Sequence, residues 1–287
     1  MYAGNLYGYT PTLAGGIIFT ILFLATTAYH TFQLSKARCW YFIPFVIGGI
    51  FQVIGYICRL VARNNLDSVT LYALQSVLIL LAPPLYAASI YMVLGRLITY
   101  LQAESLSLVR VSWMTKIFVA GDVFSFFMQS AGGGMMAIKD TNMRNTGSNI
   151  VTGGLVIQLL FFGFFVITAG LFHFRINRQP TSKSHTERES TRTQGWKQRN
   201  WITVLLALYI VSILILVRCI FRLVEYRDGF NGPIMTNEVY MYIFDALLMF
   251  IAMVVMNVYH PAVILGDGKS GRVLNSAYSD EVQMYTT

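Results

Sequence analysis

The sequence predicts an all-α membrane protein, a seven-transmembrane-helix bundle with its N-terminus outside and its C-terminus in the cytoplasm. Composition, long apolar stretches and the placement of basic residues support this prediction. Of the 287 residues, 55% are hydrophobic and only 12% are charged, whereas soluble domains carry about 25% charged residues. The apolar stretches leave only loops and tails as soluble parts, which excludes a soluble enzyme and gives no surface for nucleic acid.

Seven stretches are long enough to cross a bilayer, for which a helix needs about 17–25 mostly apolar residues. They run approximately over 13–34, 41–62, 70–98, 113–138, 150–174, 201–224 and 236–260. The third contains Pro83 and Pro84, which together remove two amide donors and predict a structural kink. Such a break either serves packing alone or lines a cavity that satisfies the freed carbonyls.

Basic residues set the predicted orientation, because Lys and Arg accumulate on the cytoplasmic side of membrane proteins. The net charge is +8, and the largest basic group lies between the fifth and sixth stretches. We therefore expect an extracellular N-terminus at 1–12 and a transmembrane domain at 13–261. That domain would contain a mobile cytoplasmic loop at about 177–199, and a cytoplasmic tail would follow at 262–287.

Charged residues inside two of the stretches indicate a polar site. Arg218, Arg222 and Glu225 are spaced i, i+4 and i+7, which places them on one stripe of a helix. Glu238 and Asp245 are seven residues apart in the next stretch. A charge at membrane depth costs a few kcal/mol or more, so such residues normally face one another or a water-filled path.

The second and fourth stretches add further polar residues. Arg59 lies near the predicted outer end of the second stretch, and Asp122 lies deeper in the fourth with Gln129 seven residues on. These residues either form ion pairs that only hold the helices together or line a vestibule open to the outside. Apolar clefts with a few convergent polar groups usually bind ligands.

Other chemistries have weaker support. His30, His173 and His260 lie near the predicted cytoplasmic ends of three different stretches, which leaves a membrane zinc hydrolase as an alternative. Neither HxxxH nor HExxH occurs, so we predict no metal, no cofactor and no enzymatic activity. A retinal pigment would need a Schiff-base lysine, which the seventh stretch lacks, and no Walker motif predicts ATP binding.

Four separated segments carry a family resemblance. They are LLAPPLYAASIYMVLGR (80–96), FVAGDVFSFFMQSAGGGM (118–135), RCIFRLVEYRDGFNG (218–232) and YIFDALLMFIAMVVMNVYHP (242–261). Together they resemble the RTA-like, or lipid-translocating exporter, family of fungal seven-span membrane proteins. The resemblance implies a plasma-membrane or vacuolar protein. It further implies a link to resistance against toxic sterol-like amines, release of sphingoid long-chain bases and, in one branch, porphyrin or haem movement.

The resemblance also implies which positions matter. They are Pro83, Pro84, Asp122, Gln129, Arg218, Arg222, Glu225, Asp245 and His260. The chain departs from the family pattern in two places: it has no N-glycosylation site near the N-terminus, and no histidine precedes Glu238. The second departure weakens a metal or haem role for that turn.

The combined hypothesis is a protein that binds and translocates or exports an amphiphile, a sphingoid base or a sterol-like amine, in the plasma membrane or an endomembrane. Its partners would be a membrane lipid or lipophilic small molecule and the bilayer itself. A seven-helix sensor of lipid stress and a porphyrin or haem transporter remain as alternatives. The predicted ligand-binding residues are Arg59, Asp122, Gln129, Arg218, Arg222, Glu225, Glu238 and Asp245.

Overall fold

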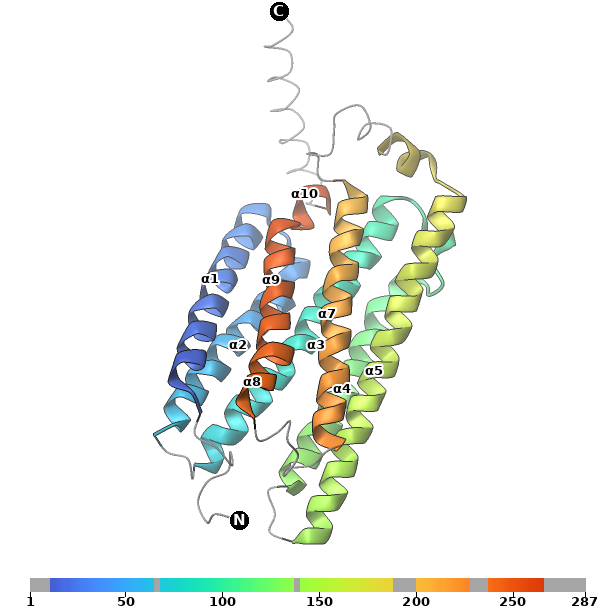
Figure 1. Ribbon diagram of the computed structural model, residues 1–287. Coiled ribbons are helices and arrows are strands. Elements are labelled where there is room, and N and C mark those ends of the chain that lie inside the picture. Colours follow the sequence, from blue (N-terminus) through green and yellow to red (C-terminus); the bar gives the residue numbers. More distant parts are fainter. Residues whose placement is uncertain (1–10, 65–67, 137–139, 188–199, 228–236, 266–287) are drawn as a thin grey trace, which may run out of the picture.

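The computed structural model describes residues 11–64, 68–136, 140–187, 200–227 and 237–265. Helix is the regular secondary structure throughout these ranges, and seven helices are long and apolar enough to cross a membrane, as predicted (Figure 1). They are α1 (Leu13–Ala37), α2 (Ile43–Ala62), α3 (Val69–Tyr100), α4 (Val111–Met136), α5 (Thr141–Arg178), α7 (Trp201–Arg227) and the composite of α8 (Glu238–Met241), η3 (Tyr242–Leu247) and α9 (Leu248–Val258). Short helices η1 (Trp40–Phe42) and η2 (Glu104–Leu106) lie between the long helices, and α10 (Ala262–Leu265) follows α9.

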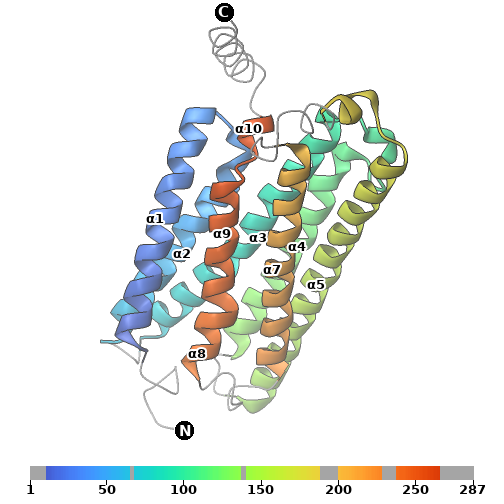
Figure 2. The same cartoon turned by 45° about the horizontal axis from the view of Figure 1, so that its top comes forward.

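The long helices pack as a closed ring in chain order. Each of α1, α2, α3, α4, α5, α7 and α9 contacts the next, and α9 returns to α1 (Figure 2). Helix α3 also contacts α7 across the bundle, so it is the helix that joins the two sides. Because successive helices run in opposite directions, the end of α2, the end of α7 and the start of α8 lie at one end of the bundle, the lower end in Figure 1.

One predicted boundary, the start of the fifth stretch, differs clearly from the structure. Helix α5 begins at Thr141, well before the predicted 150, because the Asp140 side chain caps it by accepting a hydrogen bond from the Asn142 amide at 2.9 Å. Residues 141–149 are largely polar, so the apolar stretch begins later than the helix does. Helix α3 runs through Pro83 and Pro84, in agreement with the predicted stretch 70–98, and the kink expected at the two prolines stays a prediction.

The structure describes only part of the segments that were predicted to lie outside the membrane. Helix α5 extends to Arg178, and a further helical turn spans 182–187, within the expected loop at 177–199. Residues 1–10, 188–199 and 266–287 lie outside the described residues. The extracellular N-terminus, the mobile loop, the cytoplasmic tail and the orientation in the membrane therefore stay predictions.

Glycines allow α4 and α5 to approach closely near the lower end of the bundle. A Cβ atom added to Gly132 would lie 2.6 Å from the Gly147 carbonyl oxygen and 2.9 Å from the Val151 amide nitrogen. Both neighbours are backbone atoms of α5, which cannot move without shifting the helix. Small residues commonly give membrane helices this close contact. The glycine-rich sequence at 132–134 thus contributes a packing residue.

We expect Gly132→Ala to destabilise the bundle and Gly133→Ala to have little effect. The Gly132 substitution forces the two backbones apart, an overpacking cost of about 1–3 kcal/mol. A Cβ atom at Gly133 would meet nothing within 4 Å. The thermal midpoint of each purified variant in detergent, measured by the monodisperse fraction that survives heating, checks this. Equal midpoints for the two variants would contradict the packing role of Gly132.

Candidate functional site

Asp245 is the centre of a buried ionic cluster between α7 and η3. Its side chain is 0% exposed, and its two oxygens have different arginine partners. The Arg218 Nε atom donates to Oδ1, and Arg222 Nη2 donates to Oδ2. Arg222 also donates from Nη1 to Glu225 Oε2 at 2.9 Å. The stripe predicted on α7 is therefore real, and it faces the carboxylate predicted on the seventh span.

Local backbone structure positions Asp245. Residues Tyr242–Leu247 form a π-helical segment within the seventh span. A π-turn holds one more residue than an α-turn, so it changes the direction in which the following side chains point. Such segments occur frequently at functional sites. A regular 3.6-residue period cannot anticipate this change, so sequence spacing alone did not fix where Asp245 points relative to Glu238.

Arg218 also connects this cluster to the proline pair of α3. In an α-helix the amide of residue 83 would bond the carbonyl of residue 79, and proline has no amide hydrogen. The freed Ile79 carbonyl accepts a hydrogen bond from Arg218 Nη2 at 3.3 Å. Pro83 thus supplies an acceptor for a buried arginine. The proline pair therefore serves both roles considered from the sequence: it packs within α3, and its freed carbonyl binds a residue of the polar site.

A second ion pair joins α2 to α8 at the lower end of the bundle. Arg59 Nη2 lies 2.7 Å from Glu238 Oε1, and the two side chains are only 4% and 10% exposed. Glu238 Oε2 accepts from the amide of Thr12 at 2.8 Å and from the Thr12 hydroxyl. The Tyr242 ring lies 5.8 Å from the Arg59 guanidinium. Glu238 consequently ties together the starts of α1 and α8 and the end of α2.

The two ion-pair groups together form what we call the arginine–carboxylate network. Its members are Arg59, Arg218, Arg222, Glu225, Glu238 and Asp245. Three positive and three negative side chains balance one another, so the network is electrically neutral when all six are ionised. These specific ion pairs account for the predicted gathering of arginines and carboxylates toward one end of the bundle. A shared vestibule that is open to the outside stays a prediction.

Asp122 and Gln129 lie apart from this network, on the interior face of α4. Asp122 Oδ2 accepts a hydrogen bond from the Tyr91 hydroxyl of α3 at 2.9 Å. Gln129 Nε2 donates to Gln158 Oε1 of α5 at 2.9 Å. Both residues are buried, 2% and 3% exposed. Among the described residues no arginine pairs with Asp122, so the structure separates these two predicted site residues from the other six.

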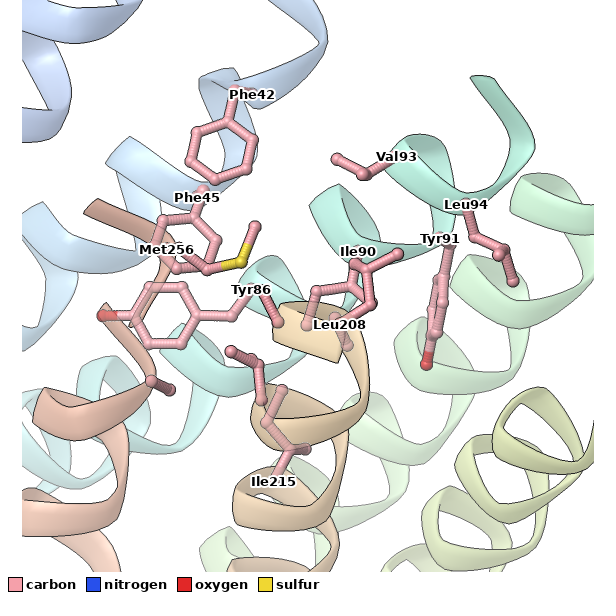
Figure 3. Close-up of a cluster of buried hydrophobic side chains, with 14 of the residues drawn as sticks. Phe42, Phe45, Tyr86, Ile90, Tyr91, Val93, Leu94, Leu208, Ile215 and Met256 are labelled. Atoms are coloured by element: carbon pink, nitrogen blue, oxygen red, sulfur yellow. The ribbon is translucent and has the colours of Figure 1, made fainter. Parts of the chain in front are cut away.

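Two tyrosines of α3 point to opposite sides of the bundle, one toward α9 and the other toward Asp122. Tyr86 and Tyr91 leave the helix in different directions, Tyr86 toward α9 and Tyr91 toward α4 and α5 (Figure 3). The Tyr86 hydroxyl donates to Met253 Sδ at 3.2 Å, whereas Tyr91 donates to Asp122. Helix α3 therefore has a polar region on each side. The direction of the side chain determines that Tyr86 contacts Met253 of α9 and that Tyr91 contacts Asp122 of α4.

Sequence reasoning missed two buried polar residues of α2. Gln52 and Tyr56 are both 0% exposed, and neither the Gln52 amide atoms nor the Tyr56 hydroxyl has a hydrogen-bond partner among the described residues. The spacing of Gln52, Tyr56 and Arg59 is i, i+4 and i+7, the same pattern that singled out α7. That spacing could have identified them.

The three histidines do not meet. The rings of His30 and His260 have centroids 6.2 Å apart, while His173 packs on the Tyr209 ring at 5.7 Å. His30 Nε2 lies 3.0 Å from the Met253 carbonyl oxygen. Within the described part of the chain, no group of three or more His, Cys, Asp or Glu side chains could hold a metal ion.

Comparison with known proteins determines the family. The model of the RTA1-like protein family matches residues 45–267. The chain belongs to the RTA1-like family. The matched segment contains every predicted ligand-binding residue, from Arg59 to Asp245, and confirms the resemblance inferred from the four sequence segments. No solved structure matches the chain.

Relatives in Saccharomyces cerevisiae cover most of the chain. Protoporphyrin uptake protein 1 is 36% identical over 288 residues, which span 88% of this chain and 91% of the relative. Protein RTA1 is 36% identical over 284 residues, or 90% and 86% of the two chains. Sphingoid long-chain base transporter RSB1 is 29% identical over 283 residues, or 90% and 74%. As an RTA1-like protein with seven apolar helices, the chain is an integral membrane protein.

Removing the Asp245 charge should destabilise the fold far more than removing the Glu225 charge. Asp245→Asn leaves Arg218 and Arg222 buried with too little negative charge, and breaking a buried pair costs about 3–5 kcal/mol. Glu225→Gln leaves both arginines paired with Asp245, so we expect a smaller loss of about 1.5 kcal/mol, the low end for a hydrogen bond to a charged group. Thermal midpoints in detergent check the order. A Glu225→Gln variant as unstable as Asp245→Asn would contradict the central place of Asp245.

Proposed function

We propose that this protein binds an amphiphile with a polar or cationic headgroup and transports it across, or exports it from, a membrane. The observation that carries the proposal is the set of buried ionic and polar side chains on the interior faces of a seven-helix membrane bundle. Such residues are costly at membrane depth and usually mark a substrate or ion path. The relative named as a sphingoid long-chain base transporter supports a long-chain amine as the substrate class.

The network can contribute to transport by exchanging partners. A headgroup that enters between α2, α7 and α8 would compete with ion pairs already formed, such as Arg59–Glu238 at 2.7 Å. A broken pair leaves its arginine without a counter-charge, so the headgroup would pass this end of the bundle without resting there, and its passage would loosen the contact between α2 and α8. Glu238 is more accessible than Asp245, because its side chain is 10% exposed and that of Asp245 is 0% exposed.

A tetrapyrrole is the second candidate substrate. The relative named as a protoporphyrin uptake protein is 36% identical, more than the sphingoid-base transporter at 29%. A porphyrin carries carboxylates on a flat apolar body, and the guanidinium groups of Arg59, Arg218 and Arg222 are suited to bidentate carboxylate binding. For this substrate the arginines would bind the ligand and the acids would position them.

We place the protein in the plasma membrane, with an endomembrane as the alternative. The same bundle could also serve as a sensor of lipid stress that binds an amphiphile without moving it. Binding and movement are separate measurements, so the sensor and the transporter give different outcomes in one reconstituted system.

The test is transbilayer movement of a fluorescent long-chain amine in liposomes that contain the purified full-length protein. We expect faster exchange between leaflets than in protein-free liposomes, read from protection against a membrane-impermeant quencher. Glu238→Gln should slow the exchange several-fold, because it removes the Arg59–Glu238 ion pair. Glu104→Gln, an exposed substitution in η2, is the matched control and should leave the rate unchanged.

The outcomes separate the candidates. Tight amine binding without movement would favour the sensor. Movement of protoporphyrin but not of the amine would favour the tetrapyrrole. Absence of binding and movement for both probes, in protein that remains monodisperse, would overturn the proposed function.

A further inference from the structure

Asp122 differs from the other buried carboxylates of the bundle in having no basic partner among the residues that the structure describes. Glu225, Glu238 and Asp245 each pair with an arginine. Asp122 is 2% exposed, accepts one hydrogen bond from Tyr91 on Oδ2, and has no hydrogen-bond partner for Oδ1 among the described residues. One oxygen of a nearly inaccessible carboxyl group is therefore available to a donor that the described part of the protein does not supply.

The groups around Asp122 cannot neutralise a negative charge. Helix α3 contributes the Tyr91 hydroxyl, and α7 contributes the Cys219 thiol within electrostatic range. Helix α5 contributes neutral residues, among them Phe161 packed against Gly121. Since an uncompensated carboxylate inside a membrane protein costs several kcal/mol, Asp122 must either carry a proton or bind a cation.

Aromatic rings pack against Tyr91, the residue that donates a hydrogen bond to Asp122. The Tyr91 ring centroid lies 4.5 Å from that of Phe165, 5.3 Å from Phe118 and 6.1 Å from Phe162. Aromatic faces attract an ammonium group, most strongly where water is excluded. Aromatic rings packed on the tyrosine that binds Asp122 therefore suit the headgroup and the first carbons of a long-chain amine better than they suit a hydrated metal cation.

The arginine–carboxylate network offers no equivalent place. Its three carboxylates already have three arginine partners, so an ammonium group that binds there must displace an arginine and leave that guanidinium unpaired. A buried charge left without its partner costs about 3–5 kcal/mol. Asp122 has no such competitor, which makes it the favourable counter-ion for a cationic headgroup.

We propose that Asp122 is the amine-recognition site and that it exchanges a proton for the protonated amine of the amphiphile. The carboxyl O–H bond breaks, the proton passes to water, and the ammonium group donates hydrogen bonds to the carboxylate formed. The local charge is zero before and after the exchange. This inference rests on the proposed function, since it names the substrate class and the counter-ion within the same transport process.

The experiment measures proton release when the purified full-length protein binds a long-chain 2-amino-1,3-diol. The protein is held in weakly buffered detergent solution with a pH-sensitive dye at about pH 6.5, where an alkylamine stays fully protonated. We expect release that rises with bound amine toward a limit of one proton per amine. The N-acetylated analogue, which has the same tail and no charge, should release none.

Matched substitutions assign the proton. Asp122→Asn should abolish proton release and weaken amine binding at least several-fold, while Asp122→Glu should restore release. Asp140→Asn is the control: it is the same substitution at the exposed N-cap of α5, where asparagine also caps well. We expect this variant to match the unsubstituted protein.

Each outcome has one meaning. Amine binding without proton release in the unsubstituted protein would overturn the exchange at Asp122 and leave the proposed transport function standing. Full release and unweakened binding in Asp122→Asn would also overturn it. Absence of amine binding altogether would instead count against the proposed function. If Asp122→Asn fails to fold, the absence of release from the unsubstituted protein still overturns the exchange, and a folded Asp122→Glu variant that binds the amine without release overturns its assignment to this carboxyl group.

Discussion

The double ion pair of Asp245 with Arg218 and Arg222 is the interaction on which the rest of the bundle depends. It joins α7 to the seventh span, and through the Ile79 carbonyl it reaches the proline pair of the interior helix α3. Each partner would be costly inside a membrane by itself. Because each side chain is compensated only when all three helices are in place, the cluster favours one arrangement of the bundle over shifted alternatives.

The other buried charged groups fall into two classes. Those of the arginine–carboxylate network are balanced by a partner in the protein, and Asp122 is not balanced by any described residue. The arginine–carboxylate network is neutral within itself and links α1, α2, α7 and the seventh span. On the other side of α3, the α4–α5 pair is held by close glycine contacts and carries Asp122, which has no basic partner in the described part of the chain. Under the function proposed above, a cationic headgroup would bind this helix pair without breaking an existing ion pair.

Sequence reasoning could recover most of the architecture because membrane helices are identified by length and apolarity. All seven spans were predicted, and the i, i+4, i+7 spacing placed Arg218, Arg222 and Glu225 on one face. The predicted start of the fifth stretch, about residue 150, is later than that of α5, because residues 141–149 are largely polar while the Asp140 cap and packing against α4 extend the helix. Tertiary contacts override local composition in such segments.

The sequence by itself determined the fold class, the family and the identity of nearly every buried charge. Only the tertiary structure decided the pairing: Arg59 with Glu238, Arg218 and Arg222 with Asp245, and Asp122 with a tyrosine alone. The physical reason is that periodicity assigns a residue to a face of its own helix. Which other helix that face meets depends on the order of the ring, on the π-helical turn before α9 and on the direction of single side chains.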